Sequence, residues 1–375
     1  MVEWRRLQDR QNDWLCVHDE AIDRRRLFLK RALSYEHDHY TRAVSTLRHG
    51  RERLIRGFAD VYFDQLELDS SVATTSSLDR LLELAVRPGK NKKPDPQRWF
   101  EALSRFDQAV SIAQIEMHDS HESLDRDMND LLDFLSERLF VDGFEKIEVY
   151  CYHDPKSDYR VHAEDIGIGH HLSRPGLVRR KTDLTCRKTV LNEVAYIRHR
   201  IKDPFETWLK MQRQICDPGK TDPYVVNDRC GLTFIVESMS HLHDIALKLV
   251  EILLDDPRDC GEEIEPLDTN YGSQKTVDAN NQHSSNGYKA AKTLMKWRGG
   301  VFEFQFLTFQ DYFSIKRSLL DSNHDLYRLR QTLDFFLPLL WPKEIYDVDW
   351  ANPSVRGTLR KWKVAQLGWR VNENE

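Results

Sequence analysis

The sequence predicts an α+β protein, with a helical region over residues 1–140 followed by a mixed-sheet domain over residues 141–340. Two observations support this division. Before residue 140 the apolar residues recur every three or four positions, which is the spacing of one helix face. After Gly143 short alternating segments, rich in β-branched and aromatic residues, are interleaved with helical ones, as in a sheet covered by helices. A basic tail over residues 341–375 completes the chain.

Helical segments are expected throughout residues 1–140. The first extends from about residue 20 to residue 66, and its apolar stripe consists of Tyr40, Val44, Leu47, Leu54, Phe58 and Val61. Ser76, with Asp79 three places later, resembles a capping box and predicts a short helix. Residues 87–96, RPGKNKKPDP, break that helix, and helical spacing then returns up to about residue 135.

The second domain is expected to combine strands with packed helices. The expected strands are KIEVYCY (146–152), YRVHAED (159–165), NEVAYIRHRIK (192–202), CGLTFIVES (230–238), NGYKAAKTLMKW (286–297) and GVFEFQFLT (300–308). Asp203-Pro204 supplies an N-cap and a first-turn proline for a helix. Further helices are expected over residues 241–256 and from about Gln310 to Phe336, with a polar loop over 257–286 and a hairpin turn at Arg298-Gly299-Gly300.

The composition predicts a folded, cytoplasmic protein without membrane contacts. Hydrophobic residues at 40% and charged residues at 31% suit a soluble chain with a sizeable core. The net charge of -6 lacks the global basic excess that is typical of broad nucleic-acid or membrane-surface binding. No apolar run is long enough for a bilayer, and the start has no apolar signal core. The six cysteines form no CxxC pair, so free thiols are expected rather than a zinc site.

A first candidate site is a group of cations around residues 200–210. Arg200 and Lys202 end a predicted strand, and Lys210 follows two helical turns later. Guanidinium and ammonium groups donate charge-assisted hydrogen bonds to phosphoryl oxygens, so the three could converge on phosphates. The alternative is a solvated face in which Glu206 and Lys210 form an i,i+4 pair.

A second candidate site consists of two carboxylates. Asp228 precedes one apolar strand, and Glu303 lies between Phe302 and Phe304 on another. Strand alternation places Glu303 on the face opposite the two phenylalanine rings. Mg²⁺ prefers oxygen ligands and often uses one or two carboxylates together with substrate phosphates, so the pair could bind this ion. The alternative is an exposed strand face.

Two weaker groups lie near the start of the strand at residues 286–297. Asn286-Gly287-Tyr288 combines a glycine that allows close backbone approach with a tyrosine that could stack on a base. The cations Lys289, Lys292, Lys296 and Arg298 could form a phosphate-binding wall or could protect an edge strand from aggregation. Neither group is specific by itself.

In their order and spacing these groups resemble the synthetase domain of the RelA/SpoT family of alarmone synthetases, a nucleotidyltransferase domain. RIKDPFETWLKMQR is similar to the family segment R-x-K-x-x-x-S-x-x-x-K-M, and NDRCGLTFIVE to its D-L-x-A/G-x-R strand. NGYKAAKT is similar to N-G-Y-x-S-x-H-T, and FEFQFLT to the E-I/V-Q-I-R-T strand. The matching positions are Arg200, Lys202, Lys210, Met211, Asp228, Gly231, Asn286, Gly287, Tyr288, Thr293, Glu303, Gln305 and Thr308.

The resemblance implies an ATP-dependent, Mg²⁺-dependent pyrophosphokinase that transfers pyrophosphate to the 3′-hydroxyl of GDP or GTP and releases AMP. It assigns Asp228 and Glu303 as the catalytic, Mg²⁺-binding carboxylates, with Glu303 also accepting the hydroxyl proton. Its phosphate-binding residues would be Arg200, Lys202, Lys210 and Lys292, and its residues for the acceptor base would be Tyr288, Asn286 and Gln305. This scheme suits phosphoryl-type transfer, which depends on positioning and charge neutralisation.

The sequence also departs from the family pattern. The family's serine, two arginines and histidine correspond to Glu206, Thr233, Leu307 and Lys292. Two-domain members of the family carry a hydrolase with an H…HD…D pattern upstream. The His-Asp pairs of this chain are not arranged in that way, so we expect a small, single-activity synthetase without alarmone hydrolase activity.

Several functions follow from these expectations. The first is alarmone synthesis in a stringent response. A second, within the same chemistry, is a toxin-type relative that pyrophosphorylates the 3′ end of tRNA. A catalytically inactive module that binds nucleotides or a partner is a third, and a structural protein that oligomerises through residues 1–140 is a fourth. Residues 1–140 would be a regulatory or partner-binding region for an antitoxin, a regulator, RNA or a second copy, with basic runs at 24–26, 90–93 and 360–363 as candidate phosphate-backbone contacts.

Overall fold

The chain folds as a mixed α+β protein with a mixed β-sheet. The computed structural model describes residues 37–56, 70–87, 95–118, 120–154, 160–161, 167–168, 178–217, 222, 224–258, 261–267, 290–317 and 323–372. The chain forms two compact units. The helical unit comprises Met1–His121, Asp203–Val226 and Phe335–Trp350, and the sheet unit comprises Glu122–Lys202, Asn227–Asp334 and Ala351–Glu375.

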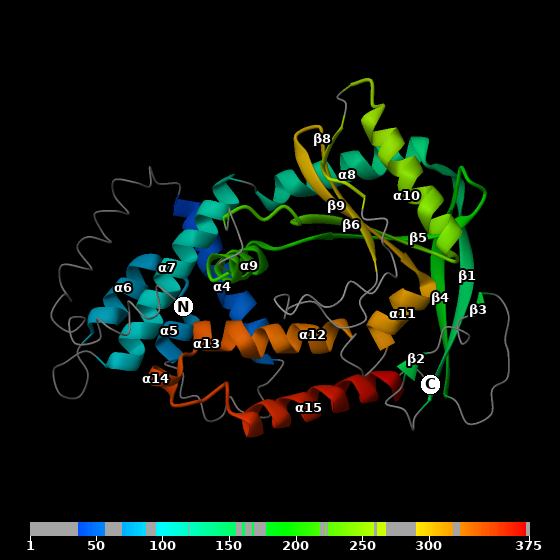
Figure 1. The fold of residues 1–375 in the computed structure, drawn as a ribbon. Coiled ribbons are helices and arrows are strands. Elements are labelled where there is room, and N and C mark those ends of the chain that lie inside the picture. The colour runs from blue at the N-terminus through cyan, green and yellow to red at the C-terminus, as the bar shows by residue number, and fades with distance from the viewer. Residues whose placement is uncertain are drawn as a thin grey trace. The chain divides into compact units, whose positions relative to one another are not determined.

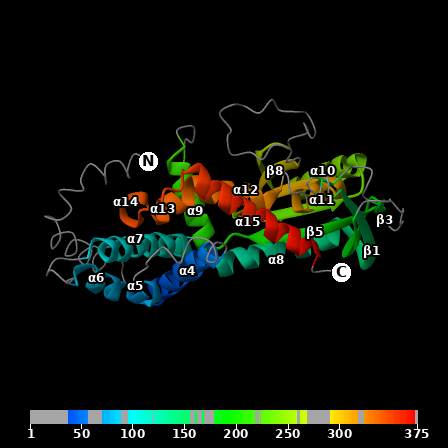
Figure 2. The ribbon, with the colours of Figure 1, turned by 90° about the horizontal axis from the view of Figure 1, so that it is seen from below.

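The helical unit is built on one long central helix. Its described helices are α4 (His37–Arg56), α5 (Ser70–Thr74), α6 (Leu78–Val86), α7 (Pro96–His118), α9 (Pro204–Ile215), α13 (Leu337–Leu340) and α14 (Lys343–Tyr346). Both α4 and α6 pack along α7 (Figures 1 and 2). On α4 the expected stripe residues Tyr40, Val44 and Leu47 are buried, which confirms the helix over 37–56. The expected extensions of this helix, including Phe58 and Val61, lie outside the described residues.

The N-caps of this unit are partly as expected. Asp203 caps α9, accepting the Glu206 amide hydrogen at 2.8 Å, and Pro204 occupies its first turn, as predicted. The expected cap at Ser76 is wrong by one residue, because Ser77 accepts the amide hydrogen of Arg80 and begins α6. Starting at Leu78 lets the helix bury that leucine in the core.

The sheet unit contains one mixed sheet. Its strands are β1 (Phe140–Asp154), β2 (Arg160–Val161), β3 (Gly167–Ile168), β4 (Val178–Thr189), β5 (Val194–Ile201), β6 (Cys230–Val236), β7 (Glu262–Glu265), β8 (Ala291–Trp297) and β9 (Gly300–Thr308). The strand order is β2-β1-β4-β5-β6-β9-β8-β7, with β3 beside β1. The β6–β9 pair is parallel and its neighbours are antiparallel, so the expected mixed sheet is confirmed. Its helices are α8 (His121–Arg138, whose first residue falls in the helical unit), α10 (Met239–Leu254), α11 (Phe309–Arg317), α12 (His324–Gln331) and α15 (Pro353–Asn372).

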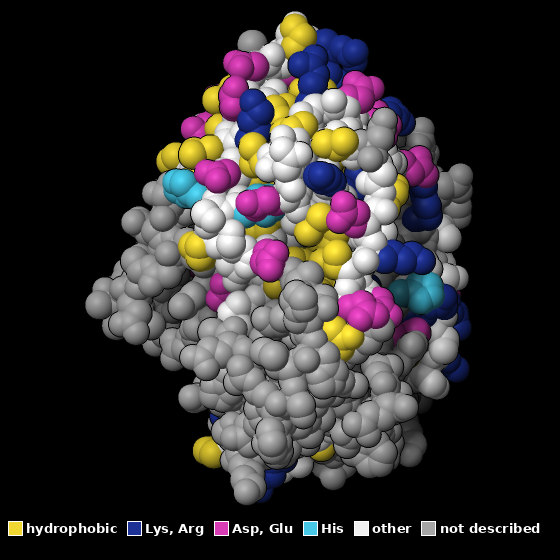
Figure 3. Space-filling view, turned by 90° about the vertical axis from the view of Figure 1, so that its right-hand side faces the viewer, with side chains coloured by type: hydrophobic (Ala, Val, Ile, Leu, Met, Phe, Trp, Pro, Cys, Tyr) yellow, Lys and Arg dark blue, Asp and Glu magenta, His cyan; other side chains and the backbone are white. Residues whose placement is uncertain are grey.

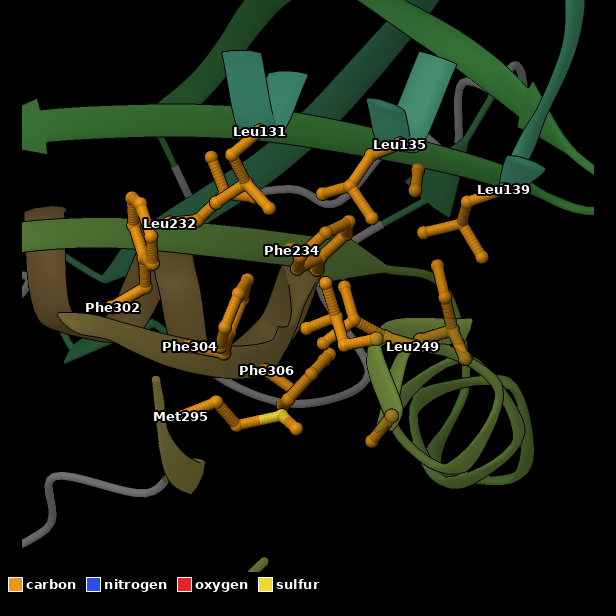
Figure 4. Close-up of a cluster of buried hydrophobic side chains, with 14 of the residues drawn as sticks. Leu131, Leu135, Leu139, Leu232, Phe234, Leu249, Met295, Phe302, Phe304 and Phe306 are labelled. Carbon is orange, nitrogen blue, oxygen red and sulfur yellow. The ribbon is translucent and has the colours of Figure 1, made fainter. Parts of the chain in front are cut away.

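One face of this sheet carries most of the apolar core. Phe234 on β6 and Phe302, Phe304 and Phe306 on β9 are fully buried there, against α8 and α10 (Figure 4). The helical residues that close this core include Leu131, Leu135, Leu242 and Leu249. Burial of these large side chains at alternate β9 positions leaves the intervening residues of β9 on the opposite face of the sheet. The core therefore fixes which face the polar residues occupy.

The opposite face carries an apolar cluster at one end. There Ile235 and Leu307, each the last residue but one of its strand (β6 and β9), pack with Phe309 and Phe313 of α11. Beyond α11 the same face becomes polar and charged. This change along the strands sets the boundary of the candidate site described below.

The structure corrects four expectations about the elements. Helix α8 was expected within the N-terminal helical region, but it packs on the sheet because its leucines share the core of β6 and β9. Strand β4 was not anticipated, and the expected loop at 257–286 contains β7 within its described part. The expected single helix Gln310–Phe336 is interrupted, because Asn323 accepts two amide hydrogens as the N-cap of a new helix, α12. A π-helical turn, Thr332–Phe336, follows α12.

The predicted β8–β9 hairpin is confirmed. Arg298 and Gly299 form its two-residue turn with φ values of 46° and 83°, which is the conformation that favours glycine and matches the twist of a hairpin. Asp256 holds this turn, accepting hydrogen bonds from the Trp297 indole at 2.9 Å and from Arg298 at 3.1 Å. The carboxylate is buried, and these hydrogen bonds, with that from the amide of Arg258, lower its pKa although burial alone would raise it.

Figure 3 shows acidic and basic side chains intermingled with apolar ones over the described part of the side that it views. None of the described helices combines the length and the apolarity that a bilayer crossing requires. Among the described cysteines, Cys186, Cys216 and Cys230 are free thiols.

Candidate functional site

The candidate site lies on the polar part of the sheet face that α11 covers at one end. Strand register places its residues in two rows. The first row is Arg200 on β5, Gly231 on β6, Glu303 on β9 and Leu294 on β8. The second row is Arg198, Thr233, Gln305 and Lys292 on the same four strands. Directly paired residues project from one face, so the prediction that Glu303 lies opposite the rings of Phe302 and Phe304 is confirmed.

The first row has an open centre at Gly231. A Cβ atom added there would meet only the backbone oxygens of Arg200 and Glu303, each at 3.9 Å. These contacts are ordinary van der Waals distances, and among the described residues no side chain lies closer. The backbone is therefore accessible between a guanidinium-bearing residue and a carboxylate-bearing residue on the two neighbouring strands.

Asp228 lies just before β6 and is held by the residue that follows β5. The Nζ atom of Lys202 forms an ion pair with the Asp228 carboxylate and donates a hydrogen bond to its backbone oxygen at 2.9 Å. The backbone also joins the two segments, since the Lys202 amide donates to the Arg229 oxygen at 2.8 Å. The side chains of Lys202 and Asp228 are only 14% and 21% exposed. Lys202 is therefore not part of a solvated face, which was the alternative interpretation for this cation.

Glu303 is oriented by its neighbours in the second row. The side-chain amide of Gln305 donates a hydrogen bond to Oε2 of Glu303 at 2.6 Å. The Nζ atom of Lys292 lies 3.7 Å from the other carboxylate oxygen, Oε1. The Glu303 side chain is 22% exposed, so one carboxylate is both fixed in place and accessible to a ligand.

Further cations lie beside the second row, where α11 begins to cover the sheet. Arg198 donates a hydrogen bond to the Tyr312 hydroxyl at 3.2 Å and lies over its ring, 5.9 Å from the centroid. Lys316 on α11 and Arg328 on α12 act electrostatically on one another and on the neighbouring titratable groups. No sequence pattern predicted Arg198, Lys316 or Arg328 as site residues. The signal for Arg198 was strand alternation, since it precedes Arg200 by two positions on the same face.

The structure brings together most of the predicted site residues. Arg200, Lys202, Asp228, Lys292, Glu303 and Gln305 all belong to the sheet unit, on or beside the four central strands. Lys210 lies on α9, which belongs to the helical unit. Asn286 and Tyr288, the candidate residues for base recognition, lie outside the described residues, as does Lys289.

Two departures from the family pattern have a structural explanation. Leu307 is 4% exposed and packs with Phe309 and Phe313, so its position is part of the apolar core under α11. An arginine there would need burial of its charge, which is unfavourable without a partner. Thr233 is paired directly with Arg198 of β5, so a guanidinium occupies the neighbouring position of the same row.

Glu206 is a third departure, and its charge is balanced within the helical unit. Arg53 on α4 forms an ion pair with Asp203, the N-cap of the same helix, α9. Burial lowers the pKa of Arg53, but its hydrogen bond to Asp203 and the charges of Asp203 and Glu206 raise it above its usual range. The carboxylate of Glu206 therefore lies in the field of a guanidinium.

Asp228 and Glu303 are carboxylates, the ligand type that a hard cation such as Mg²⁺ prefers. Asp228 and Glu303 supply two carboxylates that are partly exposed, near the first residues of the parallel strands β6 and β9. The described residues contain no group of three or more His, Cys, Asp or Glu that could hold a metal ion. An ion here would take its remaining ligands from water and substrate oxygens, which is how Mg²⁺ is commonly bound with nucleotides.

Comparisons with known proteins add no further constraint. A scan against protein-family models finds no match, and a search of curated proteins finds none.

Proposed function

We propose that the sheet unit is a Mg²⁺-dependent pyrophosphokinase that transfers pyrophosphate from ATP to the 3′-hydroxyl of GDP or GTP. One observation supports this function above the others. Glu303 is in register with Gly231 and Arg200 and lies close to Lys292, and Asp228, just before the strand of Gly231, is paired with Lys202. The resemblance to the RelA/SpoT synthetase domain names the same residues. A site with two carboxylates among cations suits the transfer of a highly charged group.

Asp228 and Glu303 would hold the Mg²⁺ ion. When bound, the ion would neutralise charge on the transferred phosphates. Lys202 already keeps Asp228 in place, and Gln305 does the same for Glu303. Such preorganised groups need little rearrangement when substrate binds, which is the main source of electrostatic catalysis.

Glu303 is the candidate general base. Its carboxylate accepts the proton of the acceptor 3′-hydroxyl while that oxygen bonds to the β-phosphorus of ATP. The bond between the β-phosphorus and the bridging oxygen breaks, and AMP leaves with that oxygen. The hydrogen bond from Gln305 occupies Oε2, so Oε1 is the oxygen free of that donor and nearer to Lys292. A base positioned within hydrogen-bond reach contributes typically 10²–10⁴-fold to rate.

Arg200 and Lys202 are the candidate ligands of the donor phosphates. Arg200 lies near the end of β5, and Lys202, two residues later, pairs with Asp228. The transferred group would therefore meet the metal site at this end of β5. Arg198 would supply the guanidinium that the resemblance expects at Thr233, because the two residues are directly paired. The planar fork of arginine matches phosphate oxygens, so the neighbouring strand can provide the same chemistry.

A transfer assay tests this proposal. The purified full chain is incubated with ATP labelled in the γ-phosphate and Mg²⁺, and GDP, GTP, ATP or bulk tRNA is offered separately. We expect label in GDP or GTP, release of AMP in equal amount, and loss of both on chelation of the metal. Label in tRNA alone would show the toxin-type activity instead. Absence of label in every acceptor, with nucleotide still bound, would contradict an enzymatic function and favour a binding module.

A further inference from the structure

Helix α10 has an inner and an outer side of different character. Its inner side packs on β6 and β9, where Leu242 and Leu249 are buried. Its outer side also carries large apolar side chains, since Met239, Leu247 and Leu254 are 45%, 50% and 37% exposed. The helix lies toward the side of the molecule that Figure 3 views, where apolar and acidic side chains adjoin (Figures 1 and 3). Single exposed leucines are common on protein surfaces, but several along one helix indicate a contact surface.

The exposed apolar residues of α10 form a stripe along the helix. Leu247, the half-buried Val250 and Leu254 follow one another at steps of three and four residues, and Met239 lies eight residues before Leu247. With about 3.6 residues per turn, these four residues lie within about a quarter of the helix circumference. From Met239 to Leu254 the stripe is about 22 Å long, at a rise of about 1.5 Å per residue. These four residues are the apolar stripe of α10.

Negative charge lies along one side of the apolar stripe. Asp244 and Asp255 are exposed, and the helical period places them about 60–80° around the helix axis from Leu247. Among the described residues, neither aspartate forms an ion pair, whereas Glu251 is paired with Lys248 at 3.0 Å. Lys248 is the only lysine or arginine of α10, so the helix itself does not neutralise the two aspartates.

The C-terminal end of the stripe is also negative. The amide of Gly261 donates a hydrogen bond to the Leu253 oxygen at 3.0 Å, which brings the start of β7 to the end of α10. On β7, Glu263 is exposed and pairs directly with Met295 of the core beneath α10, so it projects from the α10 side of the sheet. The last carbonyl groups of the helix add a partial negative charge. The acidic border of the stripe consists of Asp244, Asp255 and Glu263.

A stripe of this kind is complementary to a basic amphipathic helix. Apolar side chains that recur every three or four residues interdigitate with those of a second helix, and lysine or arginine beside them would meet the acidic border. Other occupants are less complementary in charge. A second copy of α10 brings the same acids, and its one lysine is already paired. Nucleic acids and anionic lipid surfaces are themselves negatively charged.

We propose that the apolar stripe and the acidic border bind an amphipathic helix of a partner protein, one that carries lysine or arginine beside its apolar face. Helix α10 packs on the core face of the sheet, and the candidate site lies on the opposite face. A bound partner would therefore leave the candidate site open. The inference goes beyond the proposed function and does not depend on it.

Fluorescence anisotropy with labelled synthetic peptides tests the inference. The lysine peptide has about 18 residues, with leucine at helical spacing and lysine along one border of the leucines, and the glutamate peptide has glutamate at each lysine position. The proteins compared are the wild-type chain, the double variants Leu247→Gln/Leu254→Gln and Asp244→Lys/Asp255→Lys, and the matched control Glu137→Lys. Glutamine has nearly the helix propensity of leucine, and Glu137 is an exposed acid of another helix, α8.

We expect the lysine peptide to bind the wild type and Glu137→Lys alike. Each double variant should bind it at least about tenfold more weakly, because each loses either the apolar or the charged part of the contact. The glutamate peptide should bind the wild type at least about tenfold more weakly than the lysine peptide does. Thermal unfolding checks that the variants fold, and Leu247→Gln or Asp244→Lys alone replaces a double variant whose midpoint differs from that of Glu137→Lys.

Other results would overturn the inference. It fails if the lysine peptide does not bind the wild type, or if Leu247→Gln/Leu254→Gln binds it within about twofold of the wild type. Equal binding of the lysine and glutamate peptides would remove the role of the acidic border. Sedimentation equilibrium tests the other occupant, since a wild-type dimer that Leu247→Gln/Leu254→Gln abolishes would assign the stripe to a second copy instead of a partner.

Discussion

The Nζ atom of Lys202 forms an ion pair with the carboxylate of Asp228, where β5 ends and β6 is about to begin. The same amino group donates to the Asp228 backbone oxygen at 2.9 Å. One lysine therefore joins two neighbouring strands and also fixes a carboxylate that we assign to Mg²⁺. Stability and function are linked at this pair, and the two contributions can be separated by substitution.

Lys202→Met should destabilise the protein by about 1–2 kcal/mol, because it leaves a partly buried carboxylate without its cation. Asp228→Asn should cost a similar amount. The double variant should be less destabilised than the sum of the two, because neither partner is left alone. Urea unfolding of the four proteins gives the coupling free energy of the pair. A coupling energy near zero would show that the ion pair does not form in solution.

Substitutions at Gly231 should separate fold from activity. The described residues leave the space around a Cβ at this position free to 3.9 Å, so Gly231→Ala should change stability by less than about 1 kcal/mol. Gly231→Leu should leave the thermal midpoint close to that of Gly231→Ala but abolish transfer, since its side chain would fill the space beside Arg200 and Glu303. Full activity in Gly231→Leu would show that substrate does not use this space.

A buried ionic network in the helical unit should dominate its response to substitution. Glu101 on α7 accepts hydrogen bonds from Arg51 at 2.8 Å, from Arg105 at 2.6 Å and from the Tyr346 hydroxyl. Arg51 also lies over the Trp341 ring, 4.7 Å from its centroid. Glu101→Gln leaves two guanidinium groups without their carboxylate, so it should cost about 3–5 kcal/mol. Tyr346→Phe should cost about 1–2 kcal/mol. Thermal unfolding of both variants checks this order.

The same network predicts acid sensitivity. Burial raises the pKa of Glu101, but the charges of Arg51 and Arg105 and the hydrogen bonds from Tyr346 and Arg105 together lower it more, so the net direction is downward. A carboxyl group whose pKa is lower in the folded state stabilises the fold above its unfolded value, and this contribution is lost as the pH falls through the folded value. Glu101→Gln should therefore be less destabilised relative to wild type at pH 3 than at pH 7. An unchanged difference would contradict the assignment.

His324 provides a second pH dependence with a different window. Its folded pKa of about 4 lies below the usual value of 6.5. The unfolded state therefore binds more protons between these values, so stability falls as the pH drops from about 6.5 to about 4. His324→Gln should remove roughly 1–3 kcal/mol of this loss. Urea unfolding of the wild type and of His324→Gln at pH 4 and pH 7 measures this contribution, and the same difference in stability at the two pH values would contradict the assignment.

The sequence was informative where a local pattern decided the structure. Apolar spacing predicted α4, α7 and α10, and alternation predicted the opposite faces of Glu303 and its flanking phenylalanines. It failed where tertiary packing decided. The spacing within α8 shows an apolar face but not that the sheet would cover it, and Asn323 resembles any polar loop residue until it caps a helix.

The candidate site shows the same limit. Sequence patterns placed Glu303 on β9 and Asp228 just before the neighbouring strand β6, but not the pairing of Arg198 with Thr233, which depends on the β5–β6 register. Lys316 and Arg328 come from helices far along the chain, and only the fold brings them toward Arg198. Leu307 replaces an arginine of the RelA/SpoT pattern, and only the fold shows that it is a core residue.

The proposal that Glu303 is the base of a pyrophosphate transfer is tested most directly by Glu303→Gln, with Glu251→Gln as the matched control. Glu251 is an exposed residue of α10, away from the candidate site. Both variants are assayed for transfer from labelled ATP to GDP and for binding of ATP and GDP. The account predicts that Glu303→Gln loses at least about 10²-fold in transfer while it still binds both nucleotides, and that Glu251→Gln matches the wild type. Equal transfer by the two variants would contradict the account.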